Sequence, residues 1–526
     1  MKILVSDPLS DRGIEILKKG GLSVEVKTKL SPADLIKEIS QFDGLVIRSG
    51  TKVTQEVIAA AASLKVIGRA GSGLDNVDIP AATKRGIVVM NTPGGNTVTT
   101  AEHALALILS LARQIPQATA SVRSGKWEKN RFIGLELFNK TLGIIGLGQI
   151  GSYLAKLGQG LNMNVIAYDA YLSSENARKT GVELVPLDEL FTRSDVITLH
   201  APLTAETKYL INAQSISRMK AGVRLINCAR GGIVNETDLY DALVSGKVAG
   251  AAFDVFEKEP VDPANPLLKL DNFICTPHLG AATNEAQENV AWAIAEQMVD
   301  YLVHGIVRYA VNLPSVPADL LPAVSPYLTL AERLGAFLGQ ICEGGIEKVT
   351  LEFRGEVAEL STAPITIAAL KGLLTPILEG TVNYVNAPVI AKERGIEVEE
   401  RKVSQSGNLS TLLSLKVAAS QKVHSISGTL WNRSEPRIVE IDGMALEVIP
   451  EGSMLFLSNN DKPGVIGGIG SFLGENNVNI SRMQLGRERP GGRAISVVGI
   501  DVPIPPDVLR RIQTIPNVLS VKQIKL

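Results

Sequence analysis

Short aliphatic runs alternate with amphipathic stretches from the first residues to about Gly95. Strands separated by helical stretches of roughly 10–15 residues are typical of a parallel sheet built from βαβ units. The predicted strands lie at 3–6, 24–26, 45–47, 66–67 and 87–89, and the predicted helices lie at about 10–19, 32–39 and 54–62.

A second alternating block runs from about 140 to 277 and predicts a doubly wound sheet. Its predicted strands lie at 142–145, 165–169, 196–200, 225–228, 249–254 and 273–276. A helix predicted over 284–304, with Thr283 as its cap, would lead the chain back to the first block. The first block is then discontinuous in sequence.

Between the two blocks, Thr99 and Glu102 have the spacing of a capping box, so a helix is predicted to begin at Thr99. The apolar run 104–112 inside this helix predicts that it is buried between layers. This run is the longest apolar one in the chain, and it is too short to span a bilayer.

The C-terminal part begins with a stretch marked by prolines, which predicts a linker. These are Pro314, Pro317, Pro322 and Pro326. Residues 315–449 have a mixed pattern without a motif that indicates a chemistry. The last residues alternate again, with strands at 454–458, 478–485, 493–502 and 518–524 and helices at 463–476 and 506–514. This βαββαβ order is ferredoxin-like.

Composition narrows the class of protein. A chain of 526 residues has room for about three to five domains. Its 53 Lys and Arg against 54 Asp and Glu leave no general positive field for nucleic acid or an acidic membrane surface. The three cysteines have no CxxC spacing, and the first strand follows Met1 at once, which leaves no room for a signal peptide. We therefore expect a cytoplasmic, multidomain protein without a metal site.

The string GLGQIG at 146–151 has the form of a dinucleotide-binding loop, with a predicted strand before it and a helix after it. Gly146 permits the turn, Gly148 lets the backbone approach a pyrophosphate, and Gly151 allows close packing of helix on strand. Asp169 follows roughly 20 residues later and would accept hydrogen bonds from the ribose hydroxyls. Its charge would repel a 2′-phosphate, so NAD is favoured over NADP. A tight turn without a ligand is the alternative.

Three polar residues lie at or just beyond the carboxyl ends of later strands, where open α/β sheets bind ligands. They are Arg230, Glu259 and His278. An imidazole can take the proton of a hydroxyl group as hydride leaves its carbon, and a carboxylate nearby raises its pKa. A guanidinium can hold a substrate carboxylate with two hydrogen bonds. By themselves, the alternatives are a packed histidine and solvated surface charges.

Together with GLGQIG and Asp169, the strings CARGG at 228–232, FDVFEKEP at 253–260 and TPHLGA at 276–281 closely resemble the D-isomer-specific 2-hydroxyacid dehydrogenases over about residues 1–312. The resemblance implies that Arg230 binds and polarises the substrate, that His278 is the acid and base, and that Glu259 is its partner. It also implies a set of residues around the cofactor: Gly146, Gly148, Gln149, Ile150, Gly151, Asp169, Cys228, Ala229, Arg230, Asp254, His278, Leu279, Gly280 and Ala281.

Within that family, the strings at 46–51, 68–78 and 91–96 resemble the branch that oxidises phosphoglycerate. Arg48 and Arg69 end predicted strands and could meet a carboxylate or phosphate, with Arg131 as a weaker candidate. Ser72 is placed near the nicotinamide by resemblance alone. Surface solvation or an interdomain ion pair is the alternative for the arginines.

The string LSNNDKPGVI at 457–466, followed by NVNI at 477–480, resembles an ACT domain. Asn459, Asp461 and Asn479 are then candidates for a serine effector site. Two of these positions depart from the family, because 459 is Asn where some members have His, and 461 is Asp where some have Asn. An ACT fold used only for dimerisation is the alternative.

The resemblance implies four domains in an α/β chain: 1–98 for substrate, completed by 284–312; 99–283 for NAD; an α+β intervening domain at 313–452; and an ACT domain at 453–526. The first two are expected to be flavodoxin-like and Rossmann-like. The implied activity is NAD-dependent oxidation of 3-phospho-D-glycerate in a regulated dimer or tetramer. The alternatives are a glyoxylate or hydroxypyruvate reductase, and a non-catalytic NAD-sensing protein.

Overall fold

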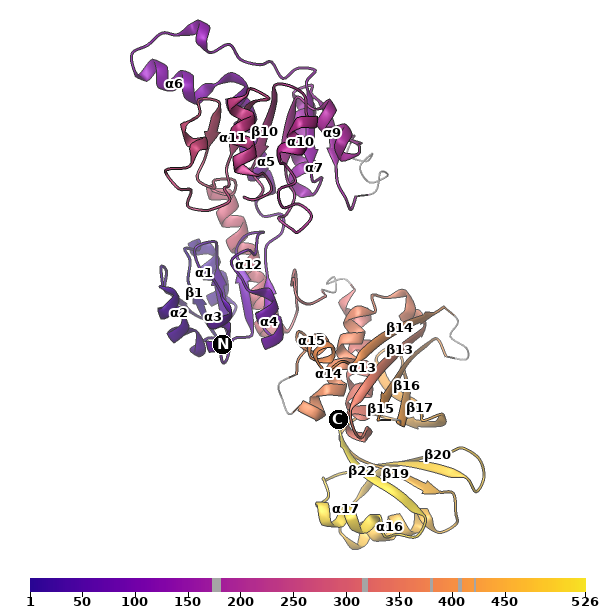
Figure 1. Cartoon of the computed structure of the whole chain (residues 1–526). Helices are drawn as coiled ribbons and strands as arrows, with labels where there is room; N and C mark the ends of the chain where they lie inside the picture. The colour runs from indigo at the N-terminus through magenta and orange to yellow at the C-terminus, as the bar shows by residue number, and fades with distance from the viewer. Residues whose placement is uncertain (173–180, 315–319, 379–381, 405–408, 421) are drawn as a thin grey trace.

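The protein is described here from a computed structural model that covers residues 1–172, 181–314, 320–378, 382–404, 409–420 and 422–526. In these described residues four sheets follow one another along the chain, with five, seven, six and four strands (Figure 1). Within the described residues, no helix is both long enough and apolar enough to cross a membrane.

The first sheet is parallel, with the order β2-β1-β3-β4-β5, as in flavodoxin. Its elements are β1 (Lys2–Val5), α1 (Asp11–Lys19), β2 (Ser23–Val26), α2 (Pro32–Glu38), β3 (Gly44–Ile47), α3 (Gln55–Ala60), β4 (Val66–Arg69), α4 (Ile79–Arg85) and β5 (Val88–Met90). The helix α12 (Asn284–His304) packs on this sheet, and Ile294 and Met298 share a core with Ile3. Thr283 accepts a hydrogen bond from the Ala286 amide, so the predicted cap is confirmed.

The second sheet is also parallel, with the order β12-β11-β10-β9-β6-β7-β8. This is the Rossmann order with one further strand. Its elements are β6 (Thr141–Ile145), α7 (Gln149–Gly160), β7 (Asn164–Tyr168), β8 (Glu183–Leu184), α9 (Leu187–Arg193), β9 (Val196–Leu199), α10 (Ala213–Arg218), β10 (Val223–Asn227), α11 (Glu236–Val244), β11 (Val248–Phe253) and β12 (Phe273–Cys275). The sequence pattern missed β8 because two residues are too few to show an alternation.

Two long helices join the first two sheets, and Figure 1 shows α12 running between them. The other is α5 (Thr97–Arg113), which is followed by α6 (Ile115–Arg123). The predicted capping box is wrong, because α5 begins two residues before Thr99 and its cap is Asn96. The Asn96 side chain accepts a hydrogen bond from the Ser72 hydroxyl at 2.7 Å and donates one to Thr100. These contacts hold the helix start in place of a capping side chain.

The third sheet is mixed, with the order β14-β13-β15-β16-β17-β18. Its elements are α13 (Leu321–Ile341), β13 (Ile346–Gly355), α14 (Ala363–Leu378), α15 (Ala387–Glu393), β14 (Glu397–Val403), β15 (Thr411–Ala419), β16 (Lys422–Trp431), β17 (Glu435–Ile441) and β18 (Met444–Val448). The proline linker is partly wrong, because Pro322 and Pro326 lie inside α13. Pro322 stands in the first turn, where an N–H is not needed. Burial of Leu330, Leu334 and Phe337 stabilises the helix beyond Pro326. Pro317 lies outside the described residues.

The fourth sheet is antiparallel, with the order β20-β21-β19-β22, which confirms the ferredoxin-like fold. Its elements are β19 (Ser453–Asn460), α16 (Val465–Glu475), β20 (Ile480–Arg487), β21 (Arg493–Ile500), α17 (Pro506–Ile512) and β22 (Val518–Lys525). One face of this sheet shares a core with the third sheet and α13. The rings of Phe337 and Phe456 meet there edge to face, with centroids 5.6 Å apart.

Candidate active site

The glycine loop between β6 and α7 has the geometry that a dinucleotide requires. Gly146 has φ +93°, and a Cβ there would lie 2.6 Å from the His200 carbonyl oxygen. A Cβ at Gly151 would lie 2.1 Å from the Gly146 oxygen, so helix and loop are packed as closely as they can be. A Cβ at Gly148 would meet no atom within 4 Å. The backbone is therefore open to a ligand at the start of α7, where the helix dipole favours a phosphate.

Asp169 follows β7 and joins two loops through its carboxylate. Oδ2 accepts a hydrogen bond from the Leu147 amide at 2.8 Å, and Oδ1 accepts from the amides of Tyr171 and Leu172. Gln149 and Ile150 form the first turn of α7. The residues present thus fit an adenosine ribose beside the loop and a pyrophosphate on the helix.

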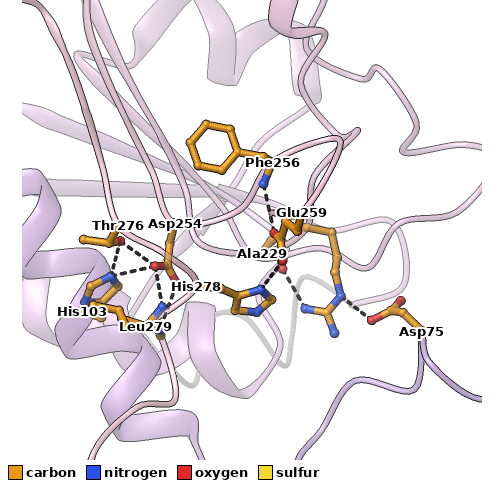
Figure 2. A network of polar contacts seen from close by, with 11 residues as sticks. Asp75, His103, Ala229, Asp254, Phe256, Glu259, Thr276, His278 and Leu279 are labelled. Carbon is orange, nitrogen blue, oxygen red and sulfur yellow. Dashed lines mark hydrogen bonds and ion pairs between the residues drawn. The ribbon is translucent and has the colours of Figure 1, made fainter. Parts of the chain in front are cut away.

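His278 and Glu259 form a close pair at the carboxyl edge of the second sheet (Figure 2). His278 Nδ1 lies 2.8 Å from Glu259 Oε2, and this hydrogen bond raises the pKa of the imidazole. Burial would raise the pKa of Glu259, but the hydrogen bonds from His278 and from the Phe256 amide lower it below its usual value. The carboxylate is therefore ionised at neutral pH, and Nε2 of His278 is the nitrogen left for a substrate.

Asp254 is 1% exposed and fixes the loop that carries His278. Its oxygens accept hydrogen bonds from the amides of Leu279 at 2.7 Å and Gly280 at 2.8 Å, and from the Thr276 hydroxyl. His103 Nε2 lies 3.0 Å from the same hydroxyl and 3.3 Å from the carboxylate (Figure 2). Burial would raise the pKa of Asp254, and these hydrogen bonds lower it.

Sequence reasoning missed His103 and Thr276 as parts of this network. A lone imidazole on the apolar stretch of α5 was the available signal. The remaining predicted cofactor residues line the same edge: Cys228 and Ala229 are buried just after β10, and Ala281 follows the Gly280 turn. Burial and the Asp254 charge raise the pKa of the Cys228 thiol, so it stays neutral. Among the described residues, no group of three His, Cys, Asp or Glu side chains could hold a metal ion.

Arg230 reaches from the second sheet to the first. Its Nε donates to Asp75 Oδ2 at 2.8 Å, and its Nη1 donates to the Ala229 carbonyl oxygen. An interdomain ion pair was the alternative to substrate binding for Arg48 and Arg69. The structure shows such an ion pair at Arg230 instead. Asp75 is mostly exposed, so this pair is weakly held and can be exchanged for a substrate.

Arg69 and Arg48 lie near Arg230 and make the cleft positive. Burial, followed by the positive charges of Arg230 and Arg48, lowers the pKa of Arg69 to about 10. Its Nε is buried and has no hydrogen-bond partner among the described residues. The carboxylates of Asp75 and Asp7 partly offset these positive charges, so the three arginines together leave a net positive charge for an anionic ligand.

Two further predicted residues lie elsewhere. Ser72 donates to Asn96 Oδ1 at the domain crossing. Arg131 forms ion pairs with Glu128 and Asp271 at 3.4 and 3.1 Å, and these fully account for its charge. The structure therefore does not bring Arg131 to the arginine cluster within one chain.

The three effector candidates do not converge either. Asn459 is buried and accepts from the Ser496 hydroxyl, while Asp461 pairs with Arg487 and accepts from the Gly491 amide. Asn479 donates to Asp501 at 2.7 Å, before the first residue of β20. Asn459 is level with Arg487, at the last residue of β20. A strand of this length separates the two ends by about 23 Å.

Three family models match successive parts of the chain. They describe the NAD-binding domain of D-isomer-specific 2-hydroxyacid dehydrogenases at 105–280, the intervening domain of D-3-phosphoglycerate dehydrogenase at 323–442, and the ACT domain at 453–517. Solved structures resemble about three fifths of the chain. A D-lactate dehydrogenase from Aquifex aeolicus, complexed with NAD and lactic acid, is 29% identical with a TM-score of 0.53, over 60% of this chain and 100% of its own. A glyoxylate reductase from Paecilomyes thermophila is 29% identical, with a TM-score of 0.55, over 59% of this chain and 98% of its own.

Full-length relatives are more similar. A D-3-phosphoglycerate dehydrogenase from Archaeoglobus fulgidus is 47% identical over 100% of both chains. One from Bacillus subtilis is 42% identical over 100% of this chain and 99% of its own. The similarity to these relatives extends over the whole chain, whereas the reductase covers 59% of it. The chain belongs to the D-3-phosphoglycerate dehydrogenase family.

Proposed function

We propose that this NAD-dependent dehydrogenase oxidises 3-phospho-D-glycerate at C2 to 3-phosphohydroxypyruvate, the first step of L-serine synthesis. The observation that carries the proposal is the His278–Glu259 pair beside Arg230, at the edge of a dinucleotide-binding sheet. A non-catalytic NAD sensor would have no need for this pair. Full-length similarity to D-3-phosphoglycerate dehydrogenases supports the phosphorylated substrate over glyoxylate or hydroxypyruvate.

The residues that would hold NAD are the glycine loop with the start of α7, Asp169, and the loop from His278 to Ala281. When bound, NAD supplies the nicotinamide that takes up the hydride from C2. Asp169 accepts a hydrogen bond from the Leu147 amide, so the conformation of the glycine loop is fixed without a ligand. Asp254 fixes the amides of Leu279 and Gly280 in the same way.

His278 takes the hydroxyl proton of the substrate at Nε2. The Nδ1–H group of His278 donates a hydrogen bond to the Glu259 carboxylate. This hydrogen bond selects the tautomer with a free lone pair on Nε2. As the C2–H bond breaks with its electron pair, the O–H bond gives its proton to Nε2 and the carbonyl forms. The Glu259 carboxylate stabilises the imidazolium that results, and in the reverse reaction the same proton returns.

Arginines orient the substrate. Arg230 would hold the carboxylate and polarise the forming carbonyl after releasing Asp75. Arg69 and Arg48 would receive the remaining negative charge, with Ser72 beside the nicotinamide. This accounts for the buried Nε of Arg69, which has no partner in the described residues.

We propose the same domain bounds as the sequence predicts: 1–98 with 284–312, 99–283, 313–452 and 453–526.

We also propose that the chain forms a dimer or tetramer. The segment from α6 to the start of β6 exposes large apolar side chains, which supports a second copy as its partner. They include Trp127, which is 86% exposed, with Ile115, Val122, Ile133 and Phe138. Free Cys228, Cys275 and Cys342 support a reducing, cytoplasmic location.

Serine is proposed as the effector of the ACT domain. Asn459 and Asp461 lie at one end of the sheet and Asn479 at the other, so a shared ligand needs one end from each of two copies. Asp461 has its pKa lowered by the Gly491 amide and by Arg487, so it is ionised and suited to an ammonium group.

A steady-state assay tests the main proposal. NADH oxidation is followed with 3-phosphohydroxypyruvate, hydroxypyruvate and glyoxylate, with and without serine. We expect kcat/KM to be highest for the phosphorylated substrate by at least about 100-fold, the scale of a charge-assisted contact. An equal or higher value for glyoxylate would contradict the proposal and favour a reductase.

A further inference from the structure

The histidine to which we assign the proton transfer has an unusual backbone conformation. His278 has φ +57°, in the left-handed region that residues other than glycine rarely adopt. Its amide donates hydrogen bonds to the carbonyl oxygens of Asp254 at 2.9 Å and Thr276 at 3.0 Å. A conformation of this kind persists only where neighbouring contacts hold it. The contacts that hold this turn therefore also fix where the imidazole lies.

The carboxylate of Asp254 holds the chain on the far side of the turn. It accepts hydrogen bonds from the amides of Leu279 and Gly280, the two residues that follow His278. Burial opposes the charge of Asp254, but the hydrogen bonds that it accepts keep its pKa below the usual value, so it is an acceptor only. The hydroxyl group of Thr276 must therefore donate its single hydrogen to Asp254 Oδ1.

That donation leaves the Thr276 oxygen as an acceptor for a further group. His103 Nε2 lies 3.0 Å from this oxygen and 3.3 Å from Asp254 Oδ1 (Figure 2). Because Thr276 has no second hydrogen to give, Nε2 of His103 must carry the hydrogen of this contact. The hydrogen bonds thus run in one direction, from His103 to Thr276 and from Thr276 to Asp254. An apolar side chain in place of the imidazole would leave Thr276 without its donor.

The helix α5 holds the same loop at a second point. Thr100 lies one turn before His103 on the same face of α5 and is 4% exposed. Its hydroxyl group donates to the Gly280 carbonyl oxygen at 2.8 Å. One helix is therefore attached to the loop on both sides of His278, at Thr276 and at Gly280.

We propose that His103 is a positioning residue for His278. Its Nε2–H group acts through Thr276 and Asp254 to hold the left-handed turn. The turn in its place keeps the His278 imidazole on Glu259, 2.8 Å away, with Nε2 directed to the substrate. This inference rests on the proposed role of His278 as acid and base, and it adds a group on α5 on which that role depends.

Substitution of His103 tests the proposal in the full-length protein, with 3-phosphohydroxypyruvate at saturating NADH. His103→Leu should lower kcat by about tenfold, because a small misplacement of a reacting group is costly. KM should stay within about twofold, since the arginines bind the substrate. His103→Gln should recover kcat to within about threefold of the unsubstituted protein, because its amide nitrogen can reach the Thr276 oxygen. A glutamine variant as slow as the leucine variant would overturn the proposal.

Thr276→Val breaks the same chain of hydrogen bonds with little change in shape, and it carries the test if His103→Leu does not fold. We expect a similar loss of kcat. The double variant His103→Leu/Thr276→Val should be no more than about twofold slower than the slower single variant, because residues that act through one chain are not additive. Losses that multiply would overturn the proposal. Glu102→Leu is the matched control, exposed beside His103 on α5, and its kcat should stay within about twofold.

His278→Ala in the same assay separates this inference from the proposed function. Near-normal turnover of His278→Ala would contradict both. A large loss in His278→Ala together with normal turnover in His103→Leu would overturn the positioning role alone.

Discussion

The catalytic cleft and the ACT end of the molecule both carry motifs at strand ends, but only the cleft brings its residues together in one chain. Arg230, Glu259 and His278 follow β10, β11 and β12, which are parallel neighbours. Asn459 lies next to the last residue of β19 and Asn479 precedes β20, and these strands are separated by the antiparallel β21. The same kind of sequence signal therefore gives one cluster of side chains in the first region and two separate groups of side chains in the other.

The difference follows from sheet geometry. In a parallel sheet every carboxyl end lies at one edge, so residues just after successive strands must meet there. In a split antiparallel sheet, the loop after one strand and the loop before the next can lie at opposite edges. A strand-end motif thus predicts convergence only where the strands are parallel.

Removal of His278 should produce the largest effect. His278→Ala removes the side chain that we propose takes the hydroxyl proton, so turnover should fall by about 10²–10⁴-fold. NADH affinity, measured by fluorescence titration, should be kept. His304→Ala, at the exposed end of α12, is the control. Near-normal turnover would remove His278 from the mechanism and with it the claim that the parallel edge assembles a working site.

Arg69→Gln tests whether the first sheet contributes charge to the same cleft. We expect kcat/KM to fall by about 100-fold for 3-phosphohydroxypyruvate and much less for hydroxypyruvate. The variant should remain folded, since it removes a buried cation that lies near Arg230 and Arg48. Arg85→Gln, exposed at the end of α4, is the matched control. Equal losses on both substrates would assign Arg69 to the carboxylate.

Two alanines in the glycine loop separate ligand approach from packing. Gly148→Ala faces open space and should weaken NADH binding by about tenfold while thermal stability is kept. Gly151→Ala would place a Cβ 2.1 Å from a backbone oxygen, so its melting temperature should drop. Differential scanning fluorimetry and NADH titration measure the two effects. An equal loss of stability in both variants would contradict the open approach to Gly148.

The sequence allowed the strands and the glycine loop to be predicted, and it placed Arg230, Glu259 and His278 at one sheet edge, because each of these depends on local pattern and on parallel geometry. It did not predict what depends on distant partners. The start of α5 is set by Asn96 contacts with Ser72 and Thr100, and the continuation of α13 beyond Pro326 is set by core burial. The Asp254 contact with His103 joins residues far apart in sequence, so no local motif marks it.

Glu259→Gln should shift a pH profile more than it lowers a rate. The Glu259 carboxylate raises the pKa of His278, and oxidation needs the neutral imidazole. Activity in the oxidation direction therefore rises as pH rises through that raised pKa. Without the charge the pKa falls, so the rising limb of kcat/KM for phosphoglycerate should move to lower pH. Reduction needs the protonated imidazole, so its activity falls as pH rises through the His278 pKa. In the variant this falling limb should also move to lower pH. A profile that does not move would show that Glu259 acts only as a packing group.

The smallest effect is expected at the ACT end. Variants there should change the response of the activity to serine, while the rate measured without serine stays the same. Asp461→Ala and Asn479→Ala should each abolish the serine response when present alone, since each removes one end of every shared site. The Asp461→Ala and Asn479→Ala chains are then co-expressed so that they form mixed oligomers. If each site takes Asp461 from one copy and Asn479 from the other, one of the two sites in a mixed pair is intact. Such mixtures should recover part of the response, measured as inhibition of NADH oxidation, whereas oligomers of Asp461→Ala/Asn479→Ala double variants should not. Recovery would show that the antiparallel sheet does in two chains what the parallel sheet does in one. If the mixture responds no better than the double variant, the three residues do not share a ligand.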